Sequence, residues 1–172
     1  MSKLLFISDC HFGHKNITKY RPQFESPEEH DEVIFDNIMS ALGKRVTLWM
    51  LGDTCFDTPS MAKVKAISNA VEHLNYIPGN HDTDSTVRLA LYKEMVTLGL
   101  FHKTGSLFTQ KDFWVCHAPI HPAELRGKFN LHGHTHDTLM PEPQYINVCV
   151  EHTKYTPICY DELRAIKEAR SK

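Results

Sequence analysis

The sequence predicts an α/β protein on the border of the α+β class, with two mixed β-sheets packed as a sandwich and flanking helices. In the first half of the chain, short apolar runs alternate with helical patterns, which is typical of parallel strands joined by crossover helices. The second half holds several short strands separated by turn residues. We find no repeat, low-complexity tract or linker, so we expect a single domain over residues 1–172.

The composition is that of a globular protein, with 41% hydrophobic and 23% charged residues in a chain long enough for a sizeable core. The net charge of −2 gives no electrostatic reason to expect a nucleic-acid or membrane partner. The apolar stretches fall far short of the ~20 residues of a membrane helix, and the first strand follows without the apolar core of a signal peptide. Five cysteines without a CxxC pair favour a reduced, cytoplasmic protein.

Three strand and helix pairs are expected in the first half. Ser26 is a suitable N-cap, Pro27 suits the first helical position and Glu29 completes a capping box. The helix that opens at Thr58 has an apolar stripe extending to Leu74. The expected strands cover residues 3–8, residues 45–51 and a short segment ending at 76–78, and the helices cover residues 26–42, 58–74 and 85–94.

The second half is expected to hold short strands and a terminal helix. Turn residues separate the apolar runs, and their spacing suits two sheets packed face to face. The strands cover residues 100–104, 107–109, 113–116, 129–132, 145–150 and 154–158, and the helix covers residues 161–169.

Polar side chains that suit a metal ion follow several of the expected strands. Side chains alternate in extended backbone, so Asp9 and His11 should share one side while Cys10 faces the other. In an α/β sheet, ligands bind at the carboxyl ends of the strands, which is where these segments would gather. The segments are Asp9-Cys10-His11, Gly52-Asp53, Gly79-Asn80-His81-Asp82, Cys116-His117-Ala118-Pro119 and Gly133-His134-Thr135-His136.

These segments supply a set of oxygen and nitrogen ligands made of Asp9, His11, Asp53, Asn80, His117, His134 and His136. The set is too large for one tetrahedral ion but suits two ions that share a bridging carboxylate. It contains no thiolate, which argues against a structural zinc finger. Carboxylate and imidazole ligands accept manganese, iron, nickel and zinc.

The order of the segments resembles the calcineurin-like metallophosphoesterase family, whose pattern is D-x-H, G-D, G-N-H-D/E, a single His and G-H-x-H. The stretch from Ile7 to Ile17 is similar to a small subgroup found in bacteria and phages. The resemblance implies a metallo-dependent phosphatase-like fold and two metal ions, manganese first among them. It implies that one ion is held by Asp9, His11, Asp53 and His136, and the other by Asp53, Asn80, His117 and His134.

The resemblance also implies a phosphoesterase acting on a small phosphate ester, with a nucleotide-like phosphodiester favoured. Metal-bound hydroxide would attack the phosphorus, and His81 would be the general acid. Two divalent ions bring +4, Asp9 and Asp53 return −2 and hydroxide −1, so the centre keeps about +1 and attracts phosphate. Asp82 is expected to assist catalysis by orienting the His81 imidazole.

The long loop after the first segment is the expected place of substrate choice. His14, Asn16 and Arg21 are candidate substrate contacts, with Arg21 as a bidentate phosphate clamp. The alternative is that these residues hold the shape of the loop. His30 and His73 lie in expected helices and are interpreted as ordinary surface residues.

Other functions stay open on the sequence alone. A phosphomonoesterase would use the same site, and a non-catalytic scaffold would be expected to lose His81 or a ligand, all of which this chain keeps. The segment at Gly52 lacks the Asp-Arg-Gly extension of Ser/Thr protein phosphatases, which disfavours a phosphoprotein substrate. A mononuclear zinc hydrolase or a metal sensor would bind one ion per chain.

Overall fold

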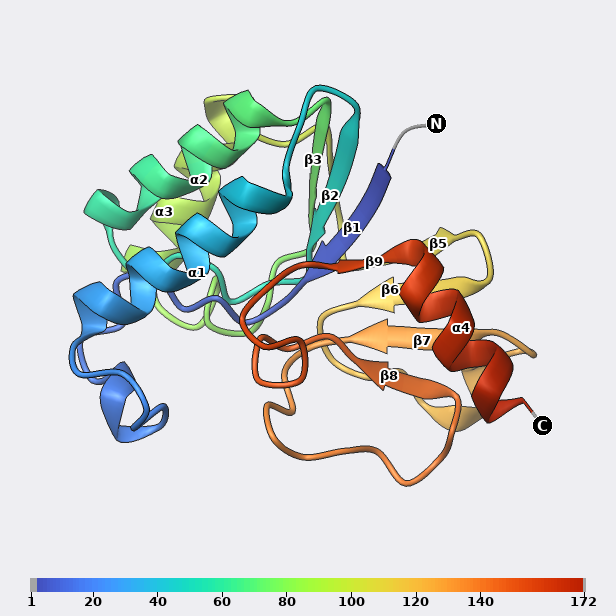
Figure 1. Cartoon of the computed structure of the whole chain (residues 1–172). Helices are drawn as coiled ribbons and strands as arrows, with labels where there is room; N and C mark the ends of the chain where they lie inside the picture. The colour runs from blue at the N-terminus through green and yellow to red at the C-terminus, as the bar shows by residue number, and fades with distance from the viewer. Residues whose placement is uncertain (1–2, 172) are drawn as a thin grey trace.

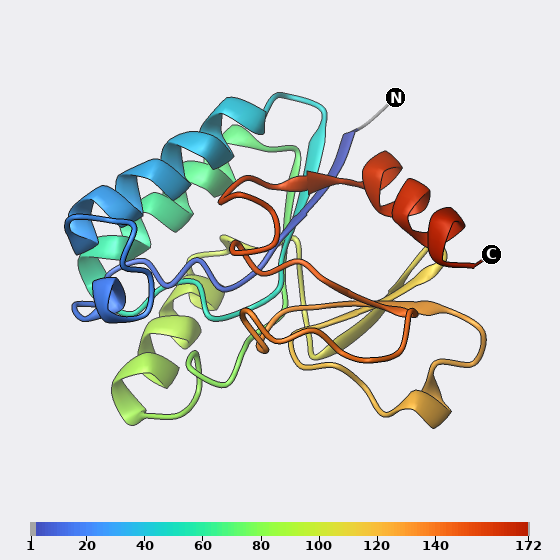
Figure 2. The same ribbon diagram turned by 60° about the horizontal axis from the view of Figure 1, so that its bottom comes forward.

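The fold is described from a computed structural model of the chain, which covers residues 3–171. Residues 1–2 and 172, the two ends of the expected domain, lie outside the described residues. Two β-sheets lie next to each other, with three helices against the first and one beside the second (Figure 1). In the turned view of Figure 2, the three helices and the second sheet lie on opposite sides of the first sheet.

The first sheet has the strand order β4-β3-β2-β1-β9. Its strands β1 (Lys3–Ile7), β2 (Val46–Met50), β3 (His73–Tyr76) and β4 (Lys103–Thr104) run parallel, and β9 (Ile158–Cys159) is antiparallel to β1. The crossover helices are α1 (Pro27–Ala41), α2 (Thr58–Ala70) and α3 (Thr86–Thr97). The predicted crossover order of the first half is confirmed, and Ser26 caps α1 by accepting from Glu29 N–H at 3.1 Å.

The second sheet has the strand order β5-β6-β7-β8. The strands are β5 (Leu107–Gln110), β6 (Phe113–Cys116), β7 (Phe129–His132) and β8 (Tyr145–Asn147). Only β5 and β6 form an antiparallel pair, whereas β6, β7 and β8 run parallel. The carboxyl ends of these three strands therefore meet at one edge of the sheet, as those of β1, β2 and β3 do in the first sheet.

The first sheet is buried on both faces because its strands alternate between two cores. Leu5 and Ile7 of β1 belong to the core beneath the helices. Phe6 between them belongs to the other core, which it shares with Phe113 of β6 and Leu131 of β7. The predicted class, two mixed sheets packed as a sandwich with flanking helices, is confirmed.

Two expected elements differ from the structure. Leu74 lies in β3 rather than at the end of a helix, because Val71 adopts extended backbone and α2 ends at Ala70. The expected strand over residues 154–158 is a turn for most of its length, since Lys154 (φ 53°) and Tyr155 (φ 58°) have left-handed backbone. The strands expected over residues 100–104 and 145–150 are present but shorter.

The helices are short, and α1 has 15 residues. The terminal helix α4 (Tyr160–Arg170) packs its buried Leu163 into the core between the two sheets. Within residues 3–171, no helix combines the length and the apolar character that crossing a membrane requires.

Candidate metal centre

The candidate site forms where the carboxyl ends of β1 and β2 meet the end of β8. Ser8, just after β1, forms a parallel bridge with Cys149, just after β8, and so joins the two sheets. Asp9 N–H donates to Gly52 O at 3.1 Å, which holds the first two ligand segments side by side. The expected gathering of strand ends is therefore present in the fold.

Several expected ligands adopt backbone conformations that are rare for residues other than glycine. The left-handed ones are Asp9 (φ 60°), His11 (φ 53°), Asp53 (φ 50°), His134 (φ 70°) and His136 (φ 45°). Such conformations cost on the order of 1–3 kcal/mol each and cluster at functional sites. The prediction that Asp9 and His11 share one side because side chains alternate in an extended strand is therefore wrong. The two side chains come together because the backbone at Asp9 and His11 is left-handed.

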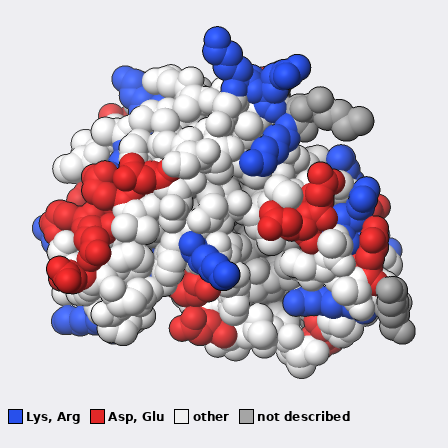
Figure 3. All heavy atoms as spheres, in the orientation of Figure 1, with Lys and Arg blue, Asp and Glu red and all other residues white. Residues whose placement is uncertain are grey.

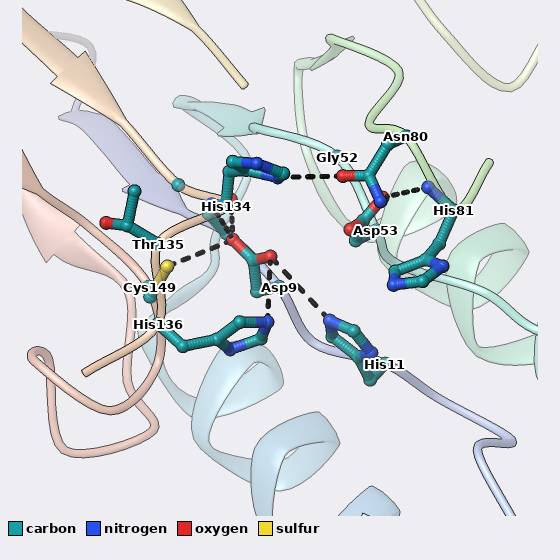
Figure 4. Close-up of polar contacts among 12 residues, drawn as sticks. Asp9, His11, Gly52, Asp53, Asn80, His81, His134, Thr135, His136 and Cys149 are labelled. Atoms are coloured by element: carbon teal, nitrogen blue, oxygen red, sulfur yellow. Dashed lines mark hydrogen bonds and ion pairs between the residues drawn. The ribbon is translucent and has the colours of Figure 1, made fainter. Parts of the chain in front are cut away.

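The first ligand group consists of Asp9, His11 and His136 (Figure 4). Asp9 Oδ1 lies 3.6 Å from His11 Nε2 and 3.7 Å from His136 Nε2. Asp9 Oδ1 and both ring nitrogens of His11 are buried without a hydrogen-bond partner. A buried polar atom without a partner is costly, so the facing atoms Asp9 Oδ1 and His11 Nε2 call for a ligand that binds lone pairs.

The second ligand group consists of Asp53, Asn80, His117 and His134. Asn80 Oδ1 lies 3.0 Å from His117 Nε2 and 2.8 Å from His134 Nδ1, and Asp53 Oδ2 lies 3.4 Å from His117 Nε2. Leu51 O lies 2.6 Å from His117 Nδ1, so that nitrogen carries the proton and Nε2 faces the group.

The two groups adjoin each other, and their spacing suits metal ions. The ligand atoms of Asp9, Asp53 and His117 all lie within 4.8 Å of one another, as do those of Asp9, His136 and Cys149. Metal bonds of ~2.0–2.2 Å in tetrahedral geometry place ligand atoms roughly 3.3–3.6 Å apart. The separations made by Asp9 Oδ1 and Asp53 Oδ2, 3.4–3.7 Å, are close to this value, and those made by Asn80 Oδ1 are shorter, at 3.0 and 2.8 Å.

The other carboxylate oxygen of Asp9 is fully engaged by the protein. Oδ2 accepts from Ser8 Oγ at 2.5 Å. It also accepts from His134 N–H at 2.9 Å and from Cys149 Sγ at 3.1 Å (Figure 4). These donors fix the carboxylate plane, so Oδ1 is aimed at His11 and His136.

The electrostatics of the site favour a bound cation. Burial raises the pKa of Asp9, but the adjacent His11 and His117 side chains outweigh it and hold the pKa far below its usual value. Burial lowers the pKa of His11 to about 4, so its lone pair is free at neutral pH. Burial also lowers the pKa of His117, yet Asp53 and Asp9 raise it to about 9, because the cleft between them favours positive charge.

Glycines in the ligand segments allow backbone and side chains to approach closely. A Cβ on Gly133 would lie 1.9 Å from Ser8 Oγ and 2.3 Å from Asp9 Oδ2. A Cβ on Gly79 would lie 2.0 Å from Asp53 Oδ1. Gly79 and Gly133 are therefore steric requirements of the site.

Replacing Gly133 with alanine is expected to lower the free energy of unfolding by about 1–3 kcal/mol, because the added methyl group displaces Ser8 and Asp9. Urea unfolding of the metal-free protein measures the change. Gly43→Ala is the matched control, since a Cβ there meets nothing within 4 Å. Equal stabilities of the two variants would contradict the steric argument.

His81 stands at the edge of the site, with its side chain 39% exposed. Its Nδ1 lies 2.8 Å from Asp84 Oδ2. The prediction that Asp82 orients this imidazole is wrong, because buried Asp82 turns inward and its Oδ2 accepts from the backbone N–H groups of Asp53 (3.0 Å) and Gly79 (2.7 Å). Asp82 thus ties the second ligand segment to the third.

Arg21 is 2% exposed, and the protein itself uses its guanidinium. Nη2 donates to Asp9 O at 2.8 Å and to Glu151 Oε1 at 2.7 Å, and Nε donates to the same Glu151 oxygen at 2.9 Å. The prediction of a phosphate clamp is therefore wrong, and the alternative, that Arg21 holds the loop, is confirmed.

The other two candidate substrate contacts differ from each other. His14 lines a pocket together with His11 and His81, so it lies where a substrate would reach the site. Asn16 is exposed at the start of the short helix η1 (Ile17–Lys19), and its carbonyl accepts from Lys19 N–H at 3.1 Å. The structure thus brings His14 to the site and leaves Asn16 in the surface of the loop.

His30 and His73 also differ from expectation. His30 is fully buried in α1, with Nε2 2.7 Å from Arg21 Nη1 and Nδ1 2.8 Å from Asp31 Oδ1. His73 begins β3 rather than lying in a helix, and its ring stacks on His102 at 3.9 Å. Periodicity alone did not show the polar partners that bury His30.

Two residues beside the site were not predicted. Glu151 Oε1 lies 3.0 Å from His136 Nδ1, and Cys149 Sγ donates to Asp9 Oδ2 at 3.1 Å. Both follow the carboxyl end of β8. The same strand-end signal that pointed to the other segments was present there.

Comparison with known proteins relates the chain to others of similar size. No family model matches the sequence. Protein AQ665 of unknown function from Aquifex aeolicus has a crystal structure with a TM-score of 0.70 over 95% of this chain and 98% of that chain at 23% identity, which shows a shared fold. A metallophosphoesterase from Sphaerobacter thermophilus is a weak structural match, with a TM-score of 0.44 and 18% identity over 78% of this chain and 60% of that chain.

The sequence relationship is closer. The uncharacterized protein MJ1445 of Methanocaldococcus jannaschii is 30% identical over 168 residues, which span 94% of this chain and 89% of that protein. The chain therefore belongs to the same family as the protein MJ1445 of Methanocaldococcus jannaschii.

Proposed function

We propose that this protein is a dinuclear metal-dependent phosphoesterase that hydrolyses a small phosphodiester. The observation that carries the proposal is the pair of adjoining ligand groups with buried, unpartnered atoms on Asp9 and His11. The order of the ligand segments, which resembles the calcineurin-like metallophosphoesterases, supports the same reaction class.

The proposed ligand sets share Asp53. One ion would be held by Asp9, His11, Asp53 and His136, and the other by Asp53, Asn80, His117 and His134. Manganese is the metal we propose, and iron, nickel or zinc would suit the same imidazole and carboxylate ligands.

When bound, two such ions would lower the pKa of a water molecule toward neutrality and offset the charge of the phosphate. His81 would give a proton from Nε2 to the leaving oxygen, because its Nδ1 faces Asp84 at 2.8 Å. Arg88 Nε lies 2.8 Å from Asp84 Oδ1, so it holds the carboxylate that orients His81. The backbone N–H of His81 donates to Asp53 Oδ1 at 2.9 Å and fixes the bridging carboxylate.

Two pockets flank the candidate site and suit a phosphate with two organic arms. The histidine pocket, of about 390 Å³, is lined by His11, His14, Tyr20, His81, His136 and Asp137 among others. The apolar pocket, of about 430 Å³, includes Asn80, Leu107, Cys116, His117, Ile120 and His134. His81 lines the first pocket, so the leaving group would occupy it, and the retained arm would lie against Leu107 and Ile120.

The charges around these pockets favour a diester over a monoester. Among residues 3–171, Arg21 is the one arginine or lysine that lines these two pockets, and it lines the histidine pocket. Its guanidinium is bound by Asp9 O and Glu151. A dianionic monoester would therefore find no additional cation from the protein. On the face shown in Figure 3, acidic side chains gather over the start of α1, whose first turn carries Glu28 and Glu29. That surface disfavours a long polyanion and supports a small substrate.

The manganese-loaded protein is expected to hydrolyse bis(p-nitrophenyl) phosphate with a kcat/KM at least ~10-fold above that for p-nitrophenyl phosphate, a difference of about 1.4 kcal/mol. Leu107→Glu should lower the diester activity more than the monoester activity, because it places a negative charge in the apolar pocket. Leu139→Glu is the matched control, since Leu139 is 62% exposed and outside both pockets.

The opposite preference, for p-nitrophenyl phosphate, would support the phosphomonoesterase alternative. Metal binding without hydrolysis of either ester would support the non-catalytic scaffold, and a single ion per chain would support a mononuclear site. Screening nucleotides and cyclic nucleotides with the active protein would then define the natural ester.

A cytoplasmic location is part of the proposal. All five cysteines, each within residues 3–171, are free thiols, and Cys159 is the one among them that is not buried. Free buried thiols suit a reducing compartment.

A further inference from the structure

Three side chains from distant parts of the chain meet beside the first ligand group. Arg21 comes from the loop after β1, His136 from the loop after β7, and Glu151 from the turn after β8. One oxygen, Glu151 Oε1, receives all three contacts: Arg21 Nη2 at 2.7 Å, Arg21 Nε at 2.9 Å and His136 Nδ1 at 3.0 Å. Glu151 Oε2 is buried without a hydrogen-bond partner.

We propose that Glu151 is a positioning residue that holds His136 ready to bind metal, and that Arg21 in turn holds Glu151. The inference rests on the proposed metal site. It adds to that site a carboxylate outside the ligand set and an arginine that does not touch substrate.

The contact with Glu151 determines which nitrogen of His136 is free. A carboxylate only accepts hydrogen bonds, so Nδ1 must carry the proton that it donates to Oε1. In the neutral ring that binds metal, Nε2 then keeps its lone pair, and it lies 3.7 Å from Asp9 Oδ1 on the side of the first ligand group. A partner of this kind fixes both the tautomer and the orientation of a metal-binding histidine.

His136 depends on this partner more than His11 and His117 depend on theirs. His11 is 5% exposed and its ring stacks on Phe56 at 4.9 Å, so packing holds it. His117 is held by its bond to Leu51 O. The His136 side chain is 41% exposed, which leaves Glu151 as the partner of its ring nitrogen Nδ1.

Arg21 connects Glu151 to the segment that carries Asp9. Its Nη2 donates both to Glu151 Oε1 and to Asp9 O, and its Nη1 lies 3.4 Å from Cys10 O. The planar guanidinium therefore spans the backbone of one ligand and the carboxylate that orients another. The two sides of the first ligand group are coupled through one buried side chain.

The test is manganese binding to the metal-free protein, measured by calorimetry and by equilibrium dialysis with metal analysis. Glu151→Ala is expected to lower the affinity for one of the two manganese ions about 10- to 100-fold. The affinity for the other ion should stay within ~3-fold of the wild-type value. Glu151→Gln should stay near the wild type, because an amide oxygen in place of Oε1 can accept all three contacts. Glu124→Ala, which breaks the exposed pair with Arg126, is the control and should change neither ion.

A second measurement needs no substitution. Long-range ¹H–¹⁵N correlation spectra of the metal-free wild type should show His136 protonated at Nδ1. An Nε2–H tautomer would overturn the inference, as would unchanged affinities in Glu151→Ala. A loss in Glu151→Gln equal to that in Glu151→Ala would show that charge, not orientation, is what Glu151 supplies, and would also overturn it.

The inference and the proposed function fail differently. Wild-type protein that binds no manganese would overturn both. Wild-type protein that binds two ions, with a Glu151→Ala variant that binds them equally well, would overturn the inference alone.

Discussion

Replacing His81 with alanine is expected to lower the turnover of a phosphodiester by ~10²–10⁴-fold while both manganese ions stay bound. The loss follows from removing the proposed proton donor to the leaving oxygen. The metals should stay, because Asp53 Oδ1 is held by the backbone N–H of His81 at 2.9 Å, which alanine keeps. Steady-state kinetics and metal analysis of the same samples measure the two effects.

The dependence on the leaving group separates proton transfer from a structural effect. An alkoxide leaving group needs a proton far more than p-nitrophenoxide does, so the His81→Ala loss should be larger for the alkyl ester. His102→Ala, an exposed histidine away from the site, should leave both rates unchanged. Equal losses on the two esters would remove His81 as the general acid.

Asp53→Asn is expected to abolish tight metal binding at both groups, since each proposed ligand set includes this carboxylate. Loss of a residue that only orients a ligand typically costs 10–100-fold in metal affinity, so loss of the bridging ligand should cost at least ~100-fold. Thermal unfolding with and without manganese measures the change. At a metal concentration of 100 Kd, the free energy of unfolding of the wild type should rise by about 2.7 kcal/mol for each occupied site. The free energy of unfolding of the variant should change little.

The metal-free form of this variant provides its own control. Burial and the nearby Asp9 raise the pKa of Asp53, but the contact with His117 outweighs them and lowers it, so the folded metal-free protein favours the charged carboxylate. The metal-free variant should therefore stay folded but unfold at a temperature somewhat below that of the wild type. Asp36→Asn, on the exposed side of α1, should keep the full metal-induced stabilisation. A metal-free Asp53→Asn protein that is unfolded would contradict this account.

Much of the fold was predictable because its signals are local. Ser26, Pro27 and the apolar spacing after them indicated α1, and short apolar runs indicated β1 and β2. The boundary near Leu74 was not predictable from spacing, since an apolar residue continues a helical stripe and a buried strand equally well. Only the extended backbone of Val71 in the structure decided between them.

The candidate site divides in the same way. Its proposed ligands follow strand ends, and parallel strands bring those ends together, so the expected set could be read from the chain before any distance was known. The hydrogen-bond partners of the charged side chains could not be predicted in this way. Asp82 is next to His81 in the sequence and Asp84 is three residues away, yet Asp82 turns inward and Asp84 contacts the imidazole.

The sequence by itself determined the order of strands and helices, the two-sheet class and the segments that meet at the candidate site, because periodicity and strand ends are local properties. Tertiary structure alone decided what Arg21 and Glu151 do. They are 130 positions apart, and no local pattern in the sequence shows that the Glu151 carboxylate binds the Arg21 guanidinium. From the sequence, an arginine near a phosphate site could equally well bind the phosphate or hold the loop in place. Only the folded structure shows that the N–H groups of Arg21 already donate to the protein.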